Sequence, residues 1–294
     1  MRAALLLAGL MLPASSPHAR TTRPPSRLWA RMVYPAGGAY AAAVAQAETL
    51  LSRRPWTTQQ RQRARALLRR AVHLSPRRPE AHRLLGDLLG AEGRWAHAAK
   101  AYDRARTLDP TYLPRNLGYR FAMAAARAGR FAAAGAALLQ LVRGTDSARM
   151  TAVLWNNAAE SYLAAGYLRR AITLYHKARA RDRTYPTPLY GLAVAYHRDG
   201  RPLLGRSTMA AALRADPGMT RLTGKTAVYF PAAARHYHLA LAWESRGQTA
   251  RAADAWKAFL AADASGPWVL QARAALARLT TAPRPRARRR SGRP

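Results

Sequence analysis

The segment around Gly224 contains the residue types that come closest to a known chemical motif. Residues 223–226, TGKT, read like the end of a phosphate-binding loop, in which backbone N–H groups and a lysine surround the phosphates of a nucleotide. Such a loop also needs a glycine at position 219, but this position holds Met219, and Gly218 is one residue too far away. No apolar strand precedes the segment. We therefore interpret it as a turn and not as a nucleotide site.

The spacing of the eight histidines does not indicate a metal site. His236 and His238 are two residues apart and point to different faces of a helix, so they cannot form the i, i+4 pair that binds zinc. Most of the others are scattered at one per expected element: His73, His82, His97, His176 and His197. There is no cysteine and no recognisable Ser-His-Asp arrangement. The sequence therefore predicts a protein that is not an enzyme, with no catalytic residue, no metal site and no cofactor.

Residues 79–112, PEAHRLLGDLLGAEGRWAHAAKAYDRARTLDPTY, show the pattern of two short helices joined by a tight turn. Leu84 and Leu88 lie on one face of the first helix, and Gly93 marks the turn. Tyr102 faces back from the second helix, which ends before Pro110. A pair this short cannot bury both of its faces, so further pairs must stack against it.

The same pattern returns along the chain. The turn glycine recurs as Gly93, Gly129, Gly166, Gly200 and Gly247. Small residues recur where two helices approach closely: Gly86 with Ala98, Ala122 with Ala134, Ala159 with Ala171, Ala193 with Gly205, and Ala240 with Ala252. Large residues recur in the second helix: Tyr102, Leu138, Tyr175, Met209 and Trp256. This pattern resembles the tetratricopeptide repeat family, whose period is about 34 residues.

The resemblance implies an all-α fold, a right-handed superhelical α-solenoid of antiparallel helix pairs over residues 39–279. It places repeats near residues 45–78, 79–112, 115–148, 152–185, 186–219 and 233–266. The repeat at 45–78 is degenerate because Pro55 interrupts its first helix. We expect residues 267–279 to form a helix that caps the stack, and residues 220–232 to be an insertion before the last repeat.

The two ends of the chain differ from the repeats. Residues 1–19 combine a charged start with an apolar run, as a secretory signal peptide does. Residues 20–38 are rich in proline and glycine and are expected to form a linker, and residues 280–294 are expected to be a disordered arginine-rich tail. These features predict an exported protein of the bacterial cell envelope or periplasm. If residues 1–19 are an ordinary helix, the protein is cytoplasmic instead.

The balance of 49 basic against 14 acidic residues gives a net charge of +35, which attracts anions. The candidates for contact with an anionic surface are Arg61, Arg65, Arg69, Arg288, Arg289 and Arg290. An anionic envelope polymer or lipid is therefore a candidate partner. Nucleic acid is less favoured, because exported proteins rarely meet it. A compositional bias toward arginine is the open alternative to a functional charge.

In the family that the repeats resemble, the first helix of each pair lines a concave groove. The resemblance places these candidates in the groove: Arg83, Asp87, Tyr119, Met123, Arg127, Asn156, Ser161, Tyr190, His197, Arg198 and Tyr237. Tyrosine gives rigid contact area and arginine binds carboxylates through paired hydrogen bonds, so together they suit an extended acidic segment of a protein partner. The alternative is that the tyrosines only pack between neighbouring repeats. The resemblance thus implies a scaffold or adaptor without a small-molecule substrate, and it leaves the oligomeric state open.

Overall fold

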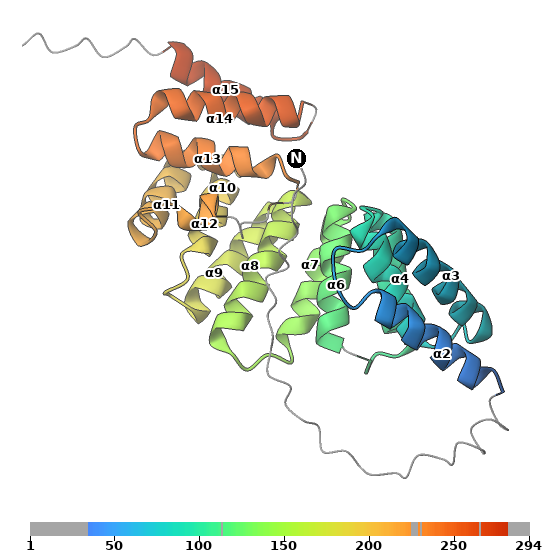
Figure 1. Cartoon of the computed structure of the whole chain (residues 1–294). Helices are drawn as coiled ribbons and strands as arrows, with labels where there is room; N and C mark the ends of the chain where they lie inside the picture. The colour runs from blue at the N-terminus through green and yellow to red at the C-terminus, as the bar shows by residue number, and fades with distance from the viewer. Residues whose placement is uncertain (1–34, 113, 225–228, 230, 265, 282–294) are drawn as a thin grey trace, which may run out of the picture. The chain divides into compact units, whose positions relative to one another are not determined.

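The computed structural model describes residues 35–112, 114–224, 229, 231–264 and 266–281, and every regular element in these ranges is a helix (Figure 1). The predicted all-α architecture of antiparallel helix pairs is confirmed. The chain divides into two compact units, with the boundary between Ser147 and Ala148. Each unit is compact by itself, and a single solenoid through residues 39–279 stays a prediction.

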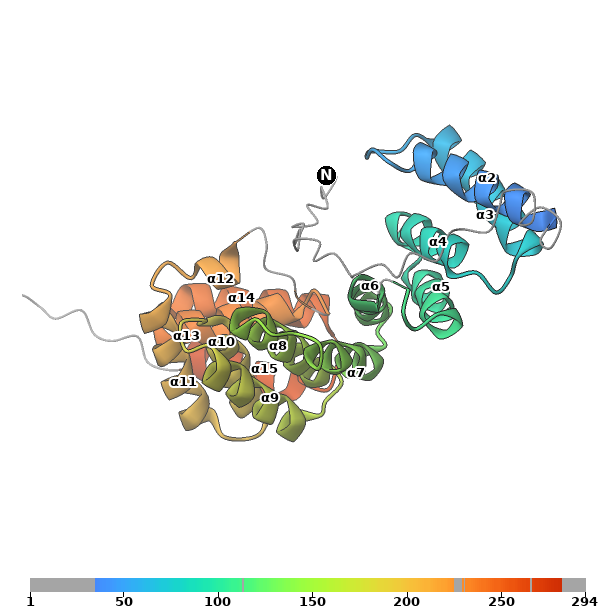
Figure 2. The same cartoon turned by 90° about the horizontal axis from the view of Figure 1, so that it is seen from below.

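The first unit consists of three helix pairs (Figure 2). Its helices are α2 (Pro35–Leu50), α3 (Thr58–Leu74), α4 (Pro79–Ala91), α5 (Trp95–Leu108), α6 (Pro114–Arg127) and α7 (Phe131–Val142). Helix α2 packs against α3, α4 against α5, and α6 against α7, while α5 also packs on α6. We call α2, α4 and α6 the first helices of this unit, because each opens a pair.

The second unit repeats this plan. Its helices are α8 (Ala148–Ala164), α9 (Leu168–Arg181), α10 (Thr187–Arg198), α11 (Pro202–Ala215), α12 (Thr220–Thr223), α13 (Ala234–Ser245), α14 (Thr249–Ala262) and α15 (Val269–Thr281). The pairs are α8 with α9, α10 with α11, and α13 with α14, and α15 packs on α14. The first helices of this unit are α8, α10 and α13.

The turn within five of the pairs has one conformation, and it explains why glycine recurs there. Gly93, Gly129, Gly166, Gly200 and Gly247 all have φ between +69° and +82°, a region that disfavours side chains with a Cβ atom. The residue after each glycine donates a backbone hydrogen bond to the carbonyl five residues earlier, as Arg94 does to Leu89 over 2.9 Å. This is the Schellman arrangement, which satisfies the carbonyl groups at the end of the first helix.

The cores of both units depend on large side chains of the second helices, as predicted. Tyr102, Leu138, Tyr175, Met209 and Trp256 are all buried. The rings of Tyr102 and Tyr175 fit against glycines: a Cβ added to Gly86 would lie 2.5 Å from the Tyr102 ring, and one added to Gly191 would lie 2.3 Å from the Tyr175 ring. The small residues of the pattern thus leave room for aromatic rings.

The start of the first unit differs from the sequence prediction. Residues 35–38, predicted as linker, form the first turn of α2, and Pro35 suits this place because the first N–H groups of a helix need no partner within it. Pro55 therefore does not interrupt a helix but lies between α2 and α3. Helix α3 begins with a capping box, in which Thr57 and Gln60 each bind the backbone N–H group of the other.

The end of the chain also shows one difference. Residues 280 and 281, predicted as tail, complete the last turn of α15. The predicted signal peptide, the remainder of the predicted linker and the tail from residue 282 onward lie outside the described residues. Within the described ranges, no helix is both long and apolar enough to cross a membrane.

Candidate functional site

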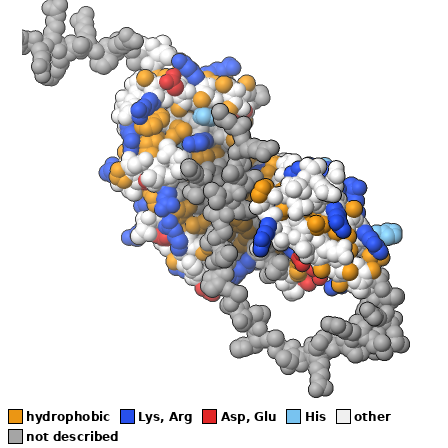
Figure 3. Space-filling model, in the orientation of Figure 1, with side chains coloured by type: hydrophobic (Ala, Val, Ile, Leu, Met, Phe, Trp, Pro, Cys, Tyr) orange, Lys and Arg blue, Asp and Glu red, His pale blue; other side chains and the backbone are white. Residues whose placement is uncertain are grey.

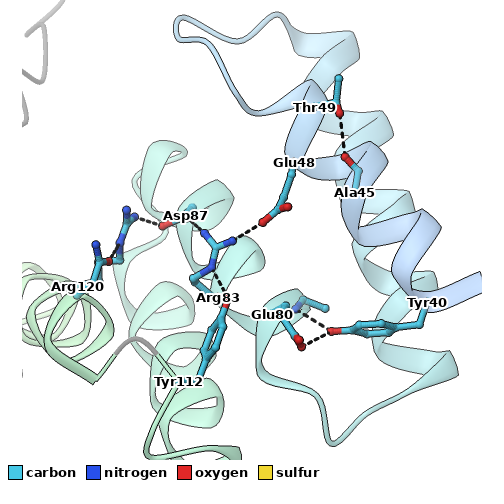
Figure 4. A network of polar contacts seen from close by, with 11 residues as sticks. Tyr40, Ala45, Glu48, Thr49, Glu80, Arg83, Asp87, Tyr112 and Arg120 are labelled. Atoms are coloured by element: carbon cyan, nitrogen blue, oxygen red, sulfur yellow. Dashed lines mark hydrogen bonds and ion pairs between the residues drawn. The ribbon is translucent and has the colours of Figure 1, made fainter. Parts of the chain in front are cut away.

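Arg83 is the centre of a polar network on the first helices of the first unit (Figure 4). It extends from α4 and donates hydrogen bonds to three groups: Glu48 Oε1 of α2 at 2.6 Å, Asp87 Oδ2 at 3.2 Å, and the Tyr112 hydroxyl at 2.9 Å. Its side chain is 15% exposed. Three hydrogen bonds thus fix the orientation of the guanidinium, and part of it remains accessible to solvent.

Asp87 continues the network to the next first helix. It accepts hydrogen bonds from Arg83 and from Arg120 of α6 (Figure 4). It also accepts one from Tyr102 of α5 at 2.7 Å. The network therefore links α2, α4 and α6, and its two arginines are balanced by two carboxylates. Burial, followed by the carboxylate of Asp87, raises the pKa of the Tyr102 hydroxyl, which stays protonated as a donor.

Glu48 is the most exposed member of the network, with half of its side chain in solvent. Exposed ion pairs contribute only about 0–1 kcal/mol, because water and salt compete for both charges. Asp87 is different, since only 11% of its side chain is exposed and it binds three donors. Glu48 is therefore the partner of Arg83 that another carboxylate could replace at little cost.

Helix α6 holds the remaining candidates of the first unit. Tyr119, Met123 and Arg127 are each partly exposed, as contact residues of a binding surface need to be. The Arg127 guanidinium lies over the ring of Trp95, 4.4 Å from its centre. Burial lowers the pKa of Arg127 and raises that of Tyr119.

Two predicted groove tyrosines of the second unit are packed inside it. Tyr190 is 1% exposed, and its hydroxyl donates to Asp216 Oδ2 at 3.1 Å. Tyr237 is fully buried, with its ring edge-to-face against Trp256 and Phe259. Their burial agrees with the alternative that the sequence left open, in which tyrosines pack between repeats. In this conformation neither ring offers surface to a ligand.

The other candidates of the second unit are buried as well. His197 Nδ1 and the Tyr237 hydroxyl lie 2.8 Å apart in a hydrogen bond, and burial together with Arg278 and Arg198 lowers the pKa of His197 to about 4. The Ser161 hydroxyl donates to the carbonyl of Asn157 within its own helix. These contacts give His197 and Ser161 structural partners.

Glu160 is a polar residue that the sequence reasoning missed, and it is surrounded by others. The imidazole Nε2 of His238, from α13, lies 3.9 Å from Glu160 Oε1. Glu160 also raises the pKa of Tyr175 from α9, after the larger effect of burial. On α10, Arg198 lies within the electrostatic influence of both Glu160 and Tyr175, and its guanidinium stacks over the ring of Tyr237 at 4.4 Å.

The spacing from the turn glycines identifies two residues of this group, Glu160 and Tyr175, in the sequence. Asp87 and Glu160 each stand six residues before a turn glycine, and Tyr102 and Tyr175 each stand nine residues after one. The two units thus carry an acidic residue and a tyrosine at equivalent repeat positions. Alignment of the repeats on their turn glycines could have found Glu160, whereas nothing local in the sequence marks His238.

Several buried polar atoms around Glu160 have no hydrogen-bond partner among the described residues. They are Asn156 Oδ1, Tyr175 Oη, Arg198 Nε and His238 Nε2. All four side chains are more than nine-tenths buried. Such an atom costs about 1–3 kcal/mol when it stays unsatisfied. We call Asn156, Glu160, Tyr175, Arg198 and His238 the Glu160 cluster.

The predicted anionic-surface residues are in different environments. Arg65 forms an ion pair with Glu92, and Arg61 donates to the Thr58 hydroxyl, whereas Arg69 is exposed on α3. Arg288, Arg289 and Arg290 lie outside the described residues. On the face in Figure 3, Lys and Arg side chains are spread over both units and few acidic ones lie between them.

A cleft in the first unit is lined by arginines, one of which is already engaged. The cleft has a volume of about 480 Å³ and lies between the end of α5, the start of α6 and the end of α7, and Arg106 and Arg115 are among its lining residues. Arg106 contacts Asp103 and Gln140 and stacks over Phe121. In the described part of the chain, no three His, Asp or Glu side chains gather closely enough to hold a metal ion.

The fold and the recurring turns define a helical-repeat protein. The sequence profile of the tetratricopeptide repeat family matches residues 56–112 and 156–220, one segment in each unit. Both units therefore contain tetratricopeptide repeats, as the resemblance predicted. No curated protein sequence matches it.

Solved structures with a similar fold share little sequence with this chain. A crystal structure of MamA is 16% identical, with a TM-score of 0.50, and the match covers 65% of this chain and 98% of MamA. MamA of Desulfovibrio magneticus RS-1 is 16% identical, with a TM-score of 0.48, and covers 62% of this chain and 97% of its own. PilF of Pseudomonas aeruginosa is 14% identical, with a TM-score of 0.46, and covers 82% and 99%. At such identities the likeness concerns the fold alone.

Proposed function

We propose that this protein is a non-enzymatic scaffold that binds an extended segment of a protein partner along the first helices of its repeats. The observation that carries the proposal is the network of Glu48, Arg83, Asp87 and Arg120, which links three successive first helices. Partly exposed, oriented polar groups suit recognition of another chain.

We further propose that the segment bound by the first unit is acidic. The net charge of +35 attracts such a partner, and Arg83 is already oriented for a carboxylate. A carboxylate of the partner would replace the half-exposed Glu48 and keep the other contacts of Arg83. Tyr119 and Met123 on α6 would supply contact area beside it.

The test combines capture of partners with two variants of equal charge. The purified protein captures partners from a lysate of its own cells at low and at high salt, and mass spectrometry identifies them. Glu48→Gln frees Arg83 and should strengthen binding of the captured protein about twofold to fivefold. Glu92→Gln changes the net charge equally but frees Arg65 instead, and should leave the affinity for that protein unchanged.

Two results would refute the proposal. If no discrete protein survives high salt, the repeats do not act as a scaffold for a protein partner. If Glu48→Gln and Glu92→Gln strengthen binding equally, the charge of the whole molecule attracts the partner, and Arg83 does not recognise it.

We propose an envelope location for this scaffold, on the basis of the charged start and apolar run of residues 1–19. Sequencing the N-terminus of the protein isolated from cells, together with cell fractionation, tests this. A mature N-terminus near residue 20 in the periplasmic or membrane fraction is the expected result. An uncleaved chain in the cytoplasm would refute it.

A second candidate function is binding of an anionic envelope polymer or lipid by α3. Arg63, Arg69 and Arg70 are exposed on this helix, and no ion pair of theirs occurs within the described residues. Nucleic acid offers the same phosphate charge but is the less favoured partner of an exported protein. Such binding should weaken log-linearly as salt rises.

A further inference from the structure

The Glu160 cluster has a mixed set of hydrogen-bonding groups on the first helices of the second unit and on α9. We propose that this cluster is a recognition site for the neutral carboxamide of a glutamine or asparagine side chain. The inference rests on the proposed binding of an extended segment, and it specifies which chemical group of that segment the second unit recognises.

Donors and acceptors in the cluster complement an amide group. Arg198 Nε and the Tyr175 hydroxyl can donate, and neither has a partner among the described residues. Asn156 Oδ1 accepts and is likewise without a partner, and the carboxylate of Glu160 lies next to it on α8. A carboxamide supplies a carbonyl for the donors and an N–H group for the acceptors, so a single neutral group satisfies both kinds.

The charges of the cluster disfavour ionised ligands. A ligand carboxylate would lie beside Glu160, and two nearby carboxylates cannot both stay ionised without repulsion. A ligand ammonium would lie beside Arg198, whose guanidinium lies over the ring of Tyr237 at 4.4 Å and over that of Trp268 at 4.9 Å. Arg198 cannot turn away easily, since 7% of it is exposed. A neutral amide meets neither repulsion.

The first unit provides an internal comparison. Asp87 occupies the repeat position equivalent to that of Glu160, but Tyr102, Arg83 and Arg120 all donate to it. There the protein itself supplies the donors that the acidic residue needs. At Glu160 the equivalent tyrosine, Tyr175, is close enough to interact electrostatically with the carboxylate, but its hydroxyl has no partner in hydrogen-bonding geometry among the described residues, so groups of a ligand can take that role.

A ligand would approach the cluster beside Glu160. This residue is the most exposed member, with 22% of its side chain in solvent. The ring of Tyr229 packs against that of His238, with their centres 5.1 Å apart, and covers another side of the cluster. The amide would therefore contact Glu160 first and then reach Arg198 and Tyr175.

The experiment is a titration of the full-length protein, labelled with ¹⁵N, with two small probes at neutral pH. The probes are N-acetylglutamine N-methylamide and the glutamate compound of the same shape. Signals of the Arg198 Nε–H group and the His238 ring are followed, and Arg198→Lys and His238→Gln variants assign them. We expect saturable shifts with the side-chain amide and binding at least about tenfold weaker with the carboxylate.

A matched pair of variants separates the site from general charge. Glu160→Gln keeps the shape but removes the repulsion and leaves the charge of Arg198, so the glutamate probe should then bind at least as well as the glutamine probe. Asp254→Asn removes one negative charge from the exposed surface of α14 in the same unit and should leave the preference unchanged. Far-ultraviolet circular dichroism confirms that each variant is folded.

Several outcomes would overturn the inference. Absence of a saturable shift with both probes would mean that the cluster is a structural polar network. Equal shifts with both probes in the unaltered protein would exclude selection by Glu160. The result is independent of partner capture: probe binding without a captured protein contradicts the scaffold, and a captured protein without probe binding contradicts the amide site alone.

Discussion

The hydroxyl of Tyr102 donates a 2.7 Å hydrogen bond to Asp87, whereas Tyr175, at the equivalent position of the second unit, has no hydrogen-bond partner among the described residues. Both tyrosines are buried and both face a glycine. The same sequence pattern therefore has two polar environments. One unit satisfies its inner polar groups internally, and the other leaves them available.

The two tyrosines should respond differently when the hydroxyl is removed. Tyr102→Phe should lower the free energy of unfolding of the first unit by about 1–2 kcal/mol, because Asp87 loses a donor. Tyr175→Phe should instead raise the free energy of unfolding of the second unit by up to about 1–3 kcal/mol, because it removes a buried hydroxyl that has no hydrogen-bond partner among the described residues. Hydrogen exchange of amides in α5 and α9 measures each unit separately. Equal losses would contradict the difference between the two sites.

Because aromatic rings pack closely on certain glycines, replacing such a glycine by alanine should lower the free energy of unfolding. Gly191→Ala should destabilise the second unit by about 1–3 kcal/mol, because the new Cβ would lie 2.3 Å from the ring of the fully buried Tyr175. Gly38→Ala is the control: nothing lies within 4 Å, and alanine favours a helix by about 0.5–1 kcal/mol. Thermal unfolding followed by circular dichroism should show opposite shifts for the two variants.

Burial of His197 makes the second unit sensitive to acid. Its pKa is about 4 in the folded protein, compared with about 6.5 in the unfolded chain, so the unfolded chain binds more protons between these values. The contribution of neutral His197 to the free energy of unfolding is therefore fully present above about pH 6.5. The free energy of unfolding falls by up to roughly 3 kcal/mol as the pH drops toward about 4. Burial lowers the pKa of His238 in the same direction.

Urea unfolding over this pH range, followed by hydrogen exchange in α10 and α13, measures the effect. His197→Gln should flatten the pH dependence, whereas His73→Gln, which changes a histidine on the surface of α3, should not. If the free energy of unfolding depends on pH with the same slope in the unaltered protein and in both variants, His197 does not control the response to acid.

We expect the exposed arginines of α3 to contribute to the affinity of the protein for anionic polymers. The triple variant Arg63→Gln, Arg69→Gln, Arg70→Gln should reduce the slope of log affinity for heparin against log salt by about one unit per arginine in contact. The control is Arg104→Gln, Arg130→Gln, Arg143→Gln, which removes three charges from the same unit but not from α3. Isothermal titration at several salt concentrations compares the variants, and equal slopes for both would exclude a specific role of α3.

The helix pairs and their turns follow from the sequence alone, because they depend on local physics. Glycine is needed wherever φ is positive, so Gly93 and its four counterparts mark the turns in the sequence itself. Apolar residues at helical spacing and the small residues opposite Tyr102 and Tyr175 likewise predict which faces pack. The start of α2 escaped prediction, since a proline followed by two glycines is also typical of a linker.

Which candidate residues remain accessible depends instead on tertiary contacts. Tyr119 and Tyr190 occupy equivalent repeat positions, yet Tyr119 is partly exposed and Tyr190 is bound to Asp216 in the interior. The partners responsible come from elsewhere in the chain, as Glu48 does for Arg83 and His238 for Glu160. Local spacing specifies which face of a helix a side chain lies on, but its burial and charge balance depend on neighbours that folding brings together from distant residues.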